Sequence, residues 1–100
     1  MALTDFEKKV LKLLKKVPRG KVITYSKLAK MAGSPRAARA VGNALHKNPD
    51  APVVPCHRVV KSDGALGGYA GGWRRKTKLL REEGVVVKNG KIVDFKKIAV

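Results

Sequence analysis

The only cysteine of the chain, Cys56, lies beside one of its two histidines in the segment VVPCHRVV, residues 53–60. A thiolate is a strong nucleophile and an imidazole can take the proton that a thiol must lose, so the pair could support covalent chemistry. Adjacent residues on a helix do not face each other, so direct contact between Cys56 and His57 is awkward and a bridging water is easier. The flanking valines would equally suit a buried, inert cysteine. The pair alone leaves both interpretations open.

Pro55 is well suited to the first position of a short helix, because the N–H that proline lacks is unpaired there in any case. That placement would put Cys56 in the first helical turn, among unpaired amides at the positive end of the helix dipole. Such an environment favours the thiolate over the thiol. The sequence therefore predicts a short helix from Pro55 and strengthens the case for a reactive Cys56 without deciding it.

The segment DGALGGYAGG, residues 63–72, is rich in glycine and has one aromatic side chain, Tyr69. Glycines allow backbone conformations and close approaches that other residues forbid. The segment lacks the Gly-Lys-Ser/Thr ending of a phosphate-binding P-loop, which argues against nucleotide hydrolysis. It is either a flexible connector or a wall whose amides hydrogen-bond a flat ligand.

Residues 4–17 are predicted to form an amphipathic helix. Thr4 and Glu7 have the spacing of a capping box, and the apolar residues that follow recur at helical spacing. The segment PRG ends this pattern, and Val22 and Ile23 are too few for more than a small strand.

Two further helices joined by a tight turn are predicted next. Thr24 can cap a brief helix over residues 25–32, which a glycine closes. Ser34 followed by Pro35 is typical of a cap with proline at the first helical position, so the next helix is predicted over residues 35–47. Two helices joined in this way, the second rich in arginine, form a helix-turn-helix pattern.

The predicted helix over residues 35–47 has two faces. Ala38, Val41 and Leu45 fall on one of them, which we expect to face the core. A polar stripe on the other side consists of Arg36, Arg39, Asn43 and Lys47. The stripe is either an ordinary solvated surface or a contact surface for DNA, and the small residues of this helix would let its backbone approach a groove floor.

A last helix is predicted from about Trp73 to Glu83, followed by a wing-like hairpin over residues 85–95 on an Asn-Gly turn. Of the two adjacent glutamates, Glu83 falls near the face that bears Trp73, whereas Glu82 points to the basic side. An inward carboxylate at the C-terminal end of a helix needs a compensating donor. His57 is one candidate and a nearby Lys or Arg is the other.

The composition bounds the rest. The chain has 100 residues and a formal net charge of +16, which favours nucleic acid as a partner unless it only makes a lysine-rich, soluble surface. The length fits one domain, with no separate N-terminal domain, and the predicted fold class is mainly α with small β elements. A single cysteine excludes an internal disulfide, and nothing is typical of a signal peptide or membrane span. We therefore expect a cytoplasmic protein without a metal site.

Five sequence blocks, taken together, resemble a known family. In chain order they are GKVITYSKLAKMAG, SPRAARAVGNALHKNP, PCHRVV, GALGGYAGG and LLREEGV. They closely resemble the DNA-binding and catalytic domain of the O6-alkylguanine-DNA alkyltransferases, the methylated-DNA--protein-cysteine methyltransferases. The resemblance runs from about Phe6 to Val86 and implies a helix-turn-helix, winged-helix-like alkyltransferase domain.

The resemblance implies a catalytic group of four residues. Cys56 would accept the alkyl group from the guanine oxygen, and His57 would remove the thiol proton through a water. Glu83 would orient His57, and Asn48 would brace the active-site turn.

The resemblance also implies how the base is reached. The recognition helix would lie in the minor groove, Tyr25 would press on the phosphate of the target nucleotide, and Arg39 would replace the extruded base in the stack. The pocket for the flipped guanine would be formed by Val59, Tyr69, the backbone around Ala70 and the Cys56 carbonyl. Flipping is needed because the alkylated oxygen is inaccessible inside a duplex.

Two positions depart from the family pattern. Ala70 stands where relatives often have serine, which matters little if the contact is made by the backbone amide. His46 stands where arginine is frequent, which should weaken one phosphate contact.

Three functions fit these features to different degrees. The first is a single-turnover DNA repair methyltransferase, and the second is an alkyltransferase-like protein that binds lesions and recruits other repair factors. A plain winged-helix regulator would leave PCHR and the glycine-rich segment without a role. Cys56 favours the first, because the alkyltransferase-like group has lost this cysteine. We expect a monomer that binds double-stranded DNA containing O6-alkylguanine, with no membrane partner and no small-molecule cofactor.

Overall fold

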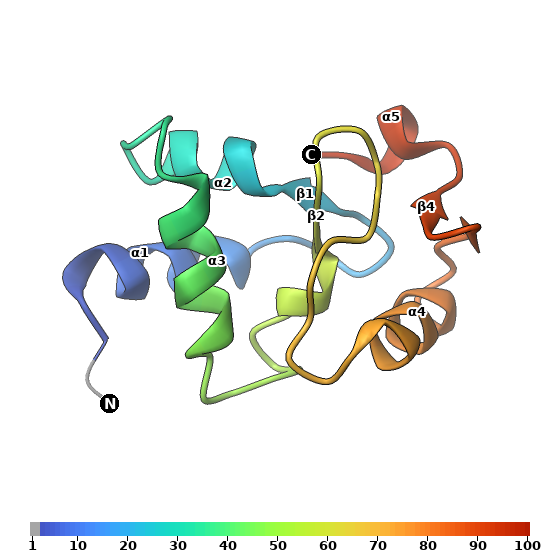
Figure 1. The fold of residues 1–100 in the computed structure, drawn as a ribbon, viewed down its shortest axis with the longest axis horizontal. Coiled ribbons are helices and arrows are strands. Elements are labelled where there is room, and N and C mark those ends of the chain that lie inside the picture. Colours follow the sequence, from blue (N-terminus) through green and yellow to red (C-terminus); the bar gives the residue numbers. More distant parts are fainter. Residues whose placement is uncertain (1–2) are drawn as a thin grey trace.

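The computed structural model describes residues 3–100, which form a mainly helical fold with small strands. The elements in chain order are α1 (Asp5–Leu14), β1 (Ile23–Thr24), α2 (Tyr25–Met31), α3 (Ala38–His46), the 3-10 turn η1 (Cys56–Arg58), β2 (Val59–Val60), α4 (Trp73–Glu82), β3 (Val87–Lys88), β4 (Lys91–Ile92) and α5 (Phe95–Ile98). Helices α1, α2 and α3 lie together at one end, and α4, the β3–β4 hairpin and α5 lie at the other (Figure 1). The predicted fold class is confirmed.

Helix α1 begins at the predicted capping box. The Glu7 amide donates to Thr4 Oγ1 at 3.1 Å, and the Thr4 amide donates to Glu7 Oε1 at 2.8 Å. The helix ends at Leu14, three residues before the predicted end at Val17. After Leu14 the chain tightens into 3-10 turns, in which the Lys16 and Val17 amides donate to the Leu13 and Leu14 carbonyls at 3.1 Å and 3.0 Å, and Pro18 disfavours the α conformation of Val17.

The predicted helix-turn-helix is confirmed, but its second helix begins later than predicted. Thr24 caps α2 by accepting from the Lys27 amide at 3.0 Å. Ser34 does not cap α3, because residues 34–37 form a separate turn in which the Ala37 amide donates to the Ser34 carbonyl at 2.9 Å. Pro35 takes the second position of that turn, where its fixed φ fits as well as it fits the start of a helix.

The two faces of α3 differ partly from the prediction. Val41 and Ala44 are fully buried, whereas the predicted core residues Ala38 and Leu45 are half-buried. Most of the predicted polar stripe is exposed, namely Arg36, Arg39 and Asn43, and His46 continues it. Lys47, the fourth predicted member, turns aside and forms an ion pair with Glu7 at 2.9 Å.

A short parallel strand pair connects the two ends of the molecule. Ile23 pairs with Val59 and Thr24 with Val60. Because side chains alternate along a strand, Val59 joins the apolar cluster with α1, α2 and α3, and Val60 joins the cluster with α4 and the hairpin. Because the strands are parallel, Tyr25, which follows β1, lies at the same end of the pair as Lys61, which follows β2.

The β3–β4 hairpin and α5 pack with the buried side of α4 in one apolar cluster. The predicted hairpin is confirmed, with Asn89 and Gly90 at φ 52° and 74° in its turn, and α5 after it was not predicted. Trp73 was expected on the inward face of α4 but is 63% exposed. Instead, the buried side chains are Lys76, Thr77 and Leu80.

Leu14→Ala is expected to lower the free energy of unfolding by about 2–5 kcal/mol, because Leu14 is fully buried and the shorter side chain leaves a cavity. Met31→Ala, at a position that is 46% exposed, should cost about 0.5 kcal/mol or less. Urea unfolding of both variants measures the two changes. Equal losses of unfolding free energy would show that Leu14 is not a core residue.

Candidate active site

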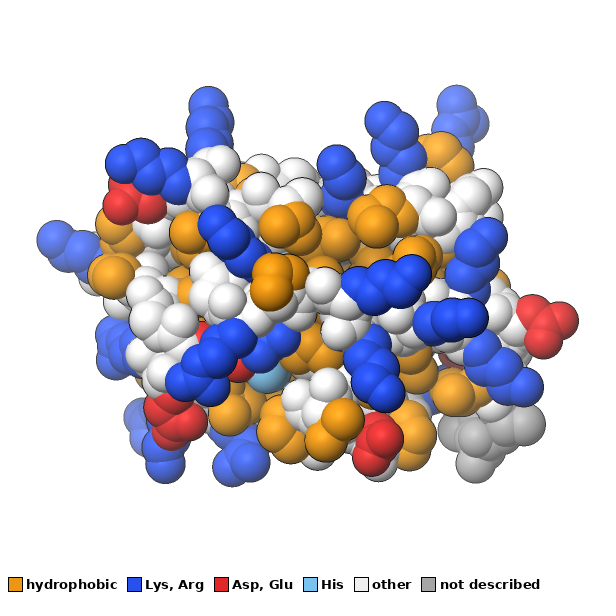
Figure 2. Space-filling model, turned by 180° about the vertical axis from the view of Figure 1, so that it is seen from behind, with side chains coloured by type: hydrophobic (Ala, Val, Ile, Leu, Met, Phe, Trp, Pro, Cys, Tyr) orange, Lys and Arg blue, Asp and Glu red, His pale blue; other side chains and the backbone are white. Residues whose placement is uncertain are grey.

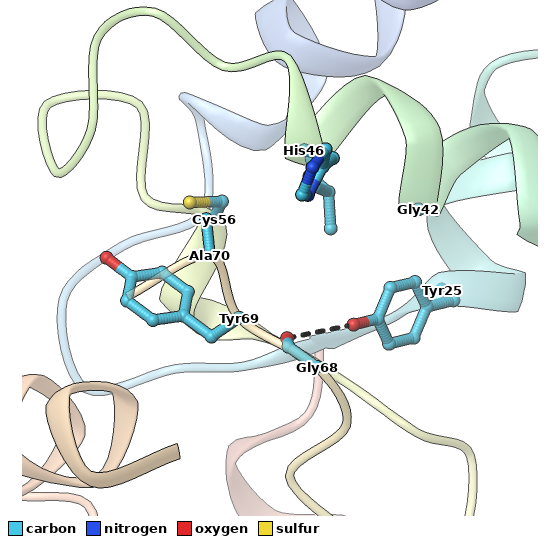
Figure 3. A pocket seen from close by; sticks show the side chains of 8 residues that line it. Tyr25, Gly42, His46, Cys56, Gly68, Tyr69 and Ala70 are labelled. Atoms are coloured by element: carbon cyan, nitrogen blue, oxygen red, sulfur yellow. Dashed lines mark hydrogen bonds between the residues drawn. The ribbon is translucent and has the colours of Figure 1, made fainter. Parts of the chain in front are cut away.

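A cavity of about 330 Å³ opens between α3 and the glycine-rich segment. Its lining residues come from four parts of the chain and are Tyr25, Gly42, Leu45, His46, Cys56, Gly68, Tyr69 and Ala70 (Figure 3). Cys56 and Tyr69 lie on one side of this space and Tyr25 lies across from them (Figure 3). The structure therefore brings the sole cysteine, two aromatic side chains and a glycine-rich wall together around one cavity.

Cys56 begins the 3-10 turn η1 rather than an α-helix. Pro55 precedes this turn instead of opening it, so the predicted helix from Pro55 is wrong in length and register. A single 3-10 turn aligns few peptide dipoles, which removes most of the expected dipole effect on the thiol. Cys56 is only 6% exposed and faces the cavity.

His57 and Arg58 both bind Glu83, which follows α4. His57 Nε2 lies 2.9 Å from Glu83 Oε2, and Arg58 donates from Nε to Oε1 at 2.9 Å and from its NH2 group to Oε2 at 2.6 Å. Arg58 also donates to the Val17 carbonyl at 2.7 Å. As predicted, Glu83 faces inward and Glu82 is exposed. Both candidate donors, the histidine and an arginine, are used at once.

Burial and charge keep His57 neutral. Desolvation lowers the pKa of His57 below its ordinary 6.5, and the hydrogen bond that His57 donates to Glu83 only partly opposes it. Burial would raise the pKa of Glu83, but hydrogen bonds from Arg58 and His57 outweigh it and lower that pKa. The contact is therefore made by a neutral imidazole, whose Nε2–H donates to a carboxylate. The other ring nitrogen, Nδ1, is buried and has no hydrogen-bond partner within residues 3–100, so its lone pair is free.

Asn48 fixes the loop that leads to Cys56. Its side-chain amide donates to the Val54 carbonyl at 2.8 Å, and its Oδ1 accepts from the Asp50 amide at 3.0 Å. The Cys56 amide donates to the same Val54 carbonyl at 2.9 Å. Asn48 is thus in direct contact with the turn that holds the thiol.

The glycine-rich wall packs closely against Tyr25. The Tyr25 hydroxyl lies 3.4 Å from the Gly68 carbonyl (Figure 3). A side chain at Gly67 would place its Cβ 3.1 Å from the Tyr25 ring, and φ at this residue is +72°. Glycine is therefore required at position 67 both for its conformation and for the close approach.

The two tyrosines of the cavity are held in the phenol form. Burial raises the pKa of Tyr25 and of Tyr69, and the nearby charge of Cys56 raises both further. Each can therefore donate a hydrogen bond at neutral pH.

A family model described as 6-O-methylguanine DNA methyltransferase, DNA binding domain, matches residues 5–85. The match includes η1, the glycine-rich wall and all of α4. The chain belongs to this family.

Relatives named methylated-DNA--protein-cysteine methyltransferase support the assignment to the alkyltransferase family. The protein from Homo sapiens is 55% identical over 81 residues, which cover 80% of this chain and 39% of that protein. The protein from Shigella flexneri is 50% identical over 84 residues, which cover 84% of this chain and 49% of that protein. The chain spans about half the length of these relatives or less.

Solved structures of two kinds resemble this alkyltransferase-family fold. Mycobacterium tuberculosis OGT in complex with DNA has a TM-score of 0.79 and 48% identity, over 82% of this chain and 51% of that one. S. pombe Atl1 in complex with damaged DNA containing O6-carboxymethylguanine has a TM-score of 0.87 and 31% identity, over 100% of this chain and 98% of that one.

One predicted cavity residue lies elsewhere, and several residues at the site were not predicted there. Val59 does not line the cavity, because its side chain is fully buried in the core beneath it. His46 was expected only as a phosphate contact, yet it lines the cavity. Arg58 was covered only by the general expectation of a Lys or Arg near Glu83, and no helical pattern indicated the fully buried Lys76.

The described residues meet neither the requirements of a metal site nor those of a membrane-spanning helix. Within residues 3–100, no three His, Cys, Asp or Glu side chains gather as a metal ion would require. None of the helices described for these residues is long and apolar enough to cross a membrane.

Glu83→Gln should lower the free energy of unfolding by about 1.5–3 kcal/mol at neutral pH, because Arg58 and His57 lose a charged acceptor. Because the pKa of Glu83 is lowered in the folded protein, its contribution to the free energy of unfolding is fully present above its ordinary pKa of 4.5. That contribution is lost as the pH falls through the pKa of the folded state. The stability difference between parent and variant should therefore shrink below pH 4.5.

Urea unfolding at neutral and acidic pH measures that difference, with the exposed neighbour in Glu82→Gln as the matched control. A difference for Glu83→Gln that stays constant across this range would show that its carboxylate charge contributes nothing.

Proposed function

We propose that this chain is a DNA repair alkyltransferase that transfers an alkyl group from O6 of guanine in duplex DNA to its own Cys56, once per molecule. The observation that carries the proposal is the pairing of a cavity-facing thiol with a neutral His57 whose Nδ1 lone pair is free. Membership of the alkyltransferase family supports it.

The chemistry needs a proton acceptor beside the thiol. His57 Nδ1 takes the thiol proton through a bridging water, and Glu83 stabilises the resulting imidazolium. The thiolate then attacks the alkyl carbon, so an S–C bond forms as the C–O bond breaks. The electron pair of that bond stays with guanine, which takes up a proton as it leaves. The thioether is stable, so each molecule reacts once.

The DNA-binding surface is proposed to be the exposed side of α3. It carries Arg39 and Asn43, with Arg36 in the turn that precedes it, and the cavity opens beside it. Lys47 contributes less than expected, because Glu7 neutralises it. Charge alone does not select this face, since Lys and Arg side chains also cover the opposite face of the molecule (Figure 2). Two similar chains are solved with DNA, which supports DNA as the partner of this chain.

Base flipping is proposed to depend on two residues at the rim. Arg39 is exposed on α3, and it lines a groove that Tyr25 shares with the main cavity. Arg39 fills the gap that the base leaves, and Tyr25 acts on the phosphate of the flipped nucleotide.

A lesion-binding module without transfer is the second candidate. The structural match to Atl1, with a TM-score of 0.87 and 31% identity, favours it, because that protein is solved with damaged DNA containing O6-carboxymethylguanine. Cys56 with its free histidine acceptor favours transfer, because a module that only binds a lesion has no use for an activated thiol.

Incubation with duplex DNA containing O6-methylguanine is expected to add one methyl group to Cys56, because the thiolate and the methyl carbon meet in the cavity. Intact-mass and peptide mass spectrometry measure it, with Cys56→Ser as the control that binds without reacting. A parent protein that holds the lesion with Cys56 unmodified would replace the transferase by the binding module.

Arg39→Ala is expected to slow reaction with duplex DNA on the order of 10- to 100-fold, because unstacking a base costs a few kcal/mol that the arginine no longer offsets. Reaction with free O6-benzylguanine, which needs no flipping, should stay near the parental rate. Arg74→Ala removes an equal charge from α4 and should change neither rate. An equal loss with both substrates would remove Arg39 from the flipping step.

A further inference from the structure

Lys76 of α4 is a fully buried lysine, with 0% of its surface exposed. Its ammonium group donates to three backbone carbonyls: Val59 at 2.7 Å, Gly68 at 3.1 Å and Leu66. Three donors are all that an ammonium group has, so its hydrogen bonds are fully used. Val59 belongs to β2 and the other two belong to the glycine-rich wall, so one side chain ties that wall to the strand that follows Cys56.

The same ammonium group is connected to the far side of the cavity. The Gly68 carbonyl that accepts from Lys76 also lies 3.4 Å from the Tyr25 hydroxyl. Tyr25 and the wall therefore share an anchor whose position depends on a buried cation.

Lys76 forms no ion pair among residues 3–100. A buried charge without a counter-charge is costly, and such groups gather at functional sites. Burial lowers the pKa of Lys76 to about 8, while the nearby charge of Cys56 acts in the opposite direction. The titratable groups around it are Cys56 and His57 of η1 and Tyr25 of α2, and α4 packs directly on η1.

The thiolate needs a positive neighbour that the rest of the site does not supply. The 3-10 turn has little dipole, His57 is neutral before the thiol loses its proton, and Arg58 is engaged by Glu83. Lys76 is the remaining buried cation beside η1.

We propose that Lys76 is a positioning residue of the alkyl-transfer site, whose buried ammonium group fixes the wall of the guanine cavity and stabilises the Cys56 thiolate. The proposal rests on the proposed function for the meaning of the cavity. Its electrostatic part concerns Cys56 and Lys76 alone, and it can be tested without DNA.

Coupled titration gives the first test. In ¹⁵N NMR of the lysine side chains, Cys56→Ser should move the titration midpoint of Lys76 to lower pH, on the order of 1 pH unit, because the thiolate no longer holds the ammonium proton. Cys56→Ser is nearly isosteric and leaves the carbonyl contacts of Lys76 in place. An unchanged midpoint would overturn the electrostatic part of the proposal.

Thiol reactivity gives the reciprocal test. Lys76→Met should slow alkylation of Cys56 by iodoacetamide about 10-fold at neutral pH, with the rate returning to the parental value at high pH, where the thiol is ionised in both proteins. Lys76→Arg should keep most of the parental rate, and the exposed Lys78→Met should leave it unchanged. A parental rate for Lys76→Met, or a loss that is equal at every pH, would overturn the proposal.

The outcomes separate the two levels of inference. If Lys76→Met does not fold, the titration of the parent and of Cys56→Ser still decides the electrostatic part. If the parent takes no methyl group from DNA but the titrations of Cys56 and Lys76 are coupled, the proposed function is contradicted and the role of Lys76 is not. If the parent takes the methyl group but the two titrations are independent, only the role of Lys76 is contradicted.

Discussion

The site depends on one buried carboxylate. Glu83 accepts hydrogen bonds from His57 and Arg58, and so joins the C-terminal end of α4 to the turn that carries Cys56. Through Arg58 the same connection reaches the Val17 carbonyl after α1. Because the carboxylate occupies His57 Nε2, it also decides which ring nitrogen is left to take a proton. The position and the tautomer of the proton acceptor are therefore set by one interaction.

Two desolvated charged groups, Glu83 and Lys76, hold together the elements around the cavity at a cost in stability. Glu83 and Lys76 are charged groups removed from water in a chain of only 100 residues, whose core is correspondingly small. Glu83 accepts hydrogen bonds from η1, and Lys76 donates hydrogen bonds to β2 and the wall, so together they hold η1, the wall and α4 in register. The arrangement accounts for a cavity whose walls come from four separate parts of the chain.

Local signals predicted local structure well, and tertiary burial was where they failed. The capping box of Thr4 and Glu7 and the Thr24 cap correctly predicted where α1 and α2 begin, because these hydrogen bonds form within one turn. The helix starts predicted at Pro35 and Pro55 were wrong. Pro35 lies in a turn and Pro55 precedes a 3-10 turn, and the fixed φ of proline fits these positions as well as it fits the first position of a helix. Lys76 was missed because burial of a lysine depends on three carbonyls from distant segments, which no helical pattern reveals. The inward side of Glu83 was predicted from helical spacing, although Trp73 on the supposed same face is exposed.

The most direct test of the proton acceptor is ¹⁵N NMR of the two ring nitrogens of His57 in the free protein at neutral pH. We expect a neutral imidazole with the proton on Nε2, bound to Glu83, and an unprotonated Nδ1. An imidazolium, or a neutral ring with the proton on Nδ1, would contradict it, because His57 could then not accept the proton of the Cys56 thiol.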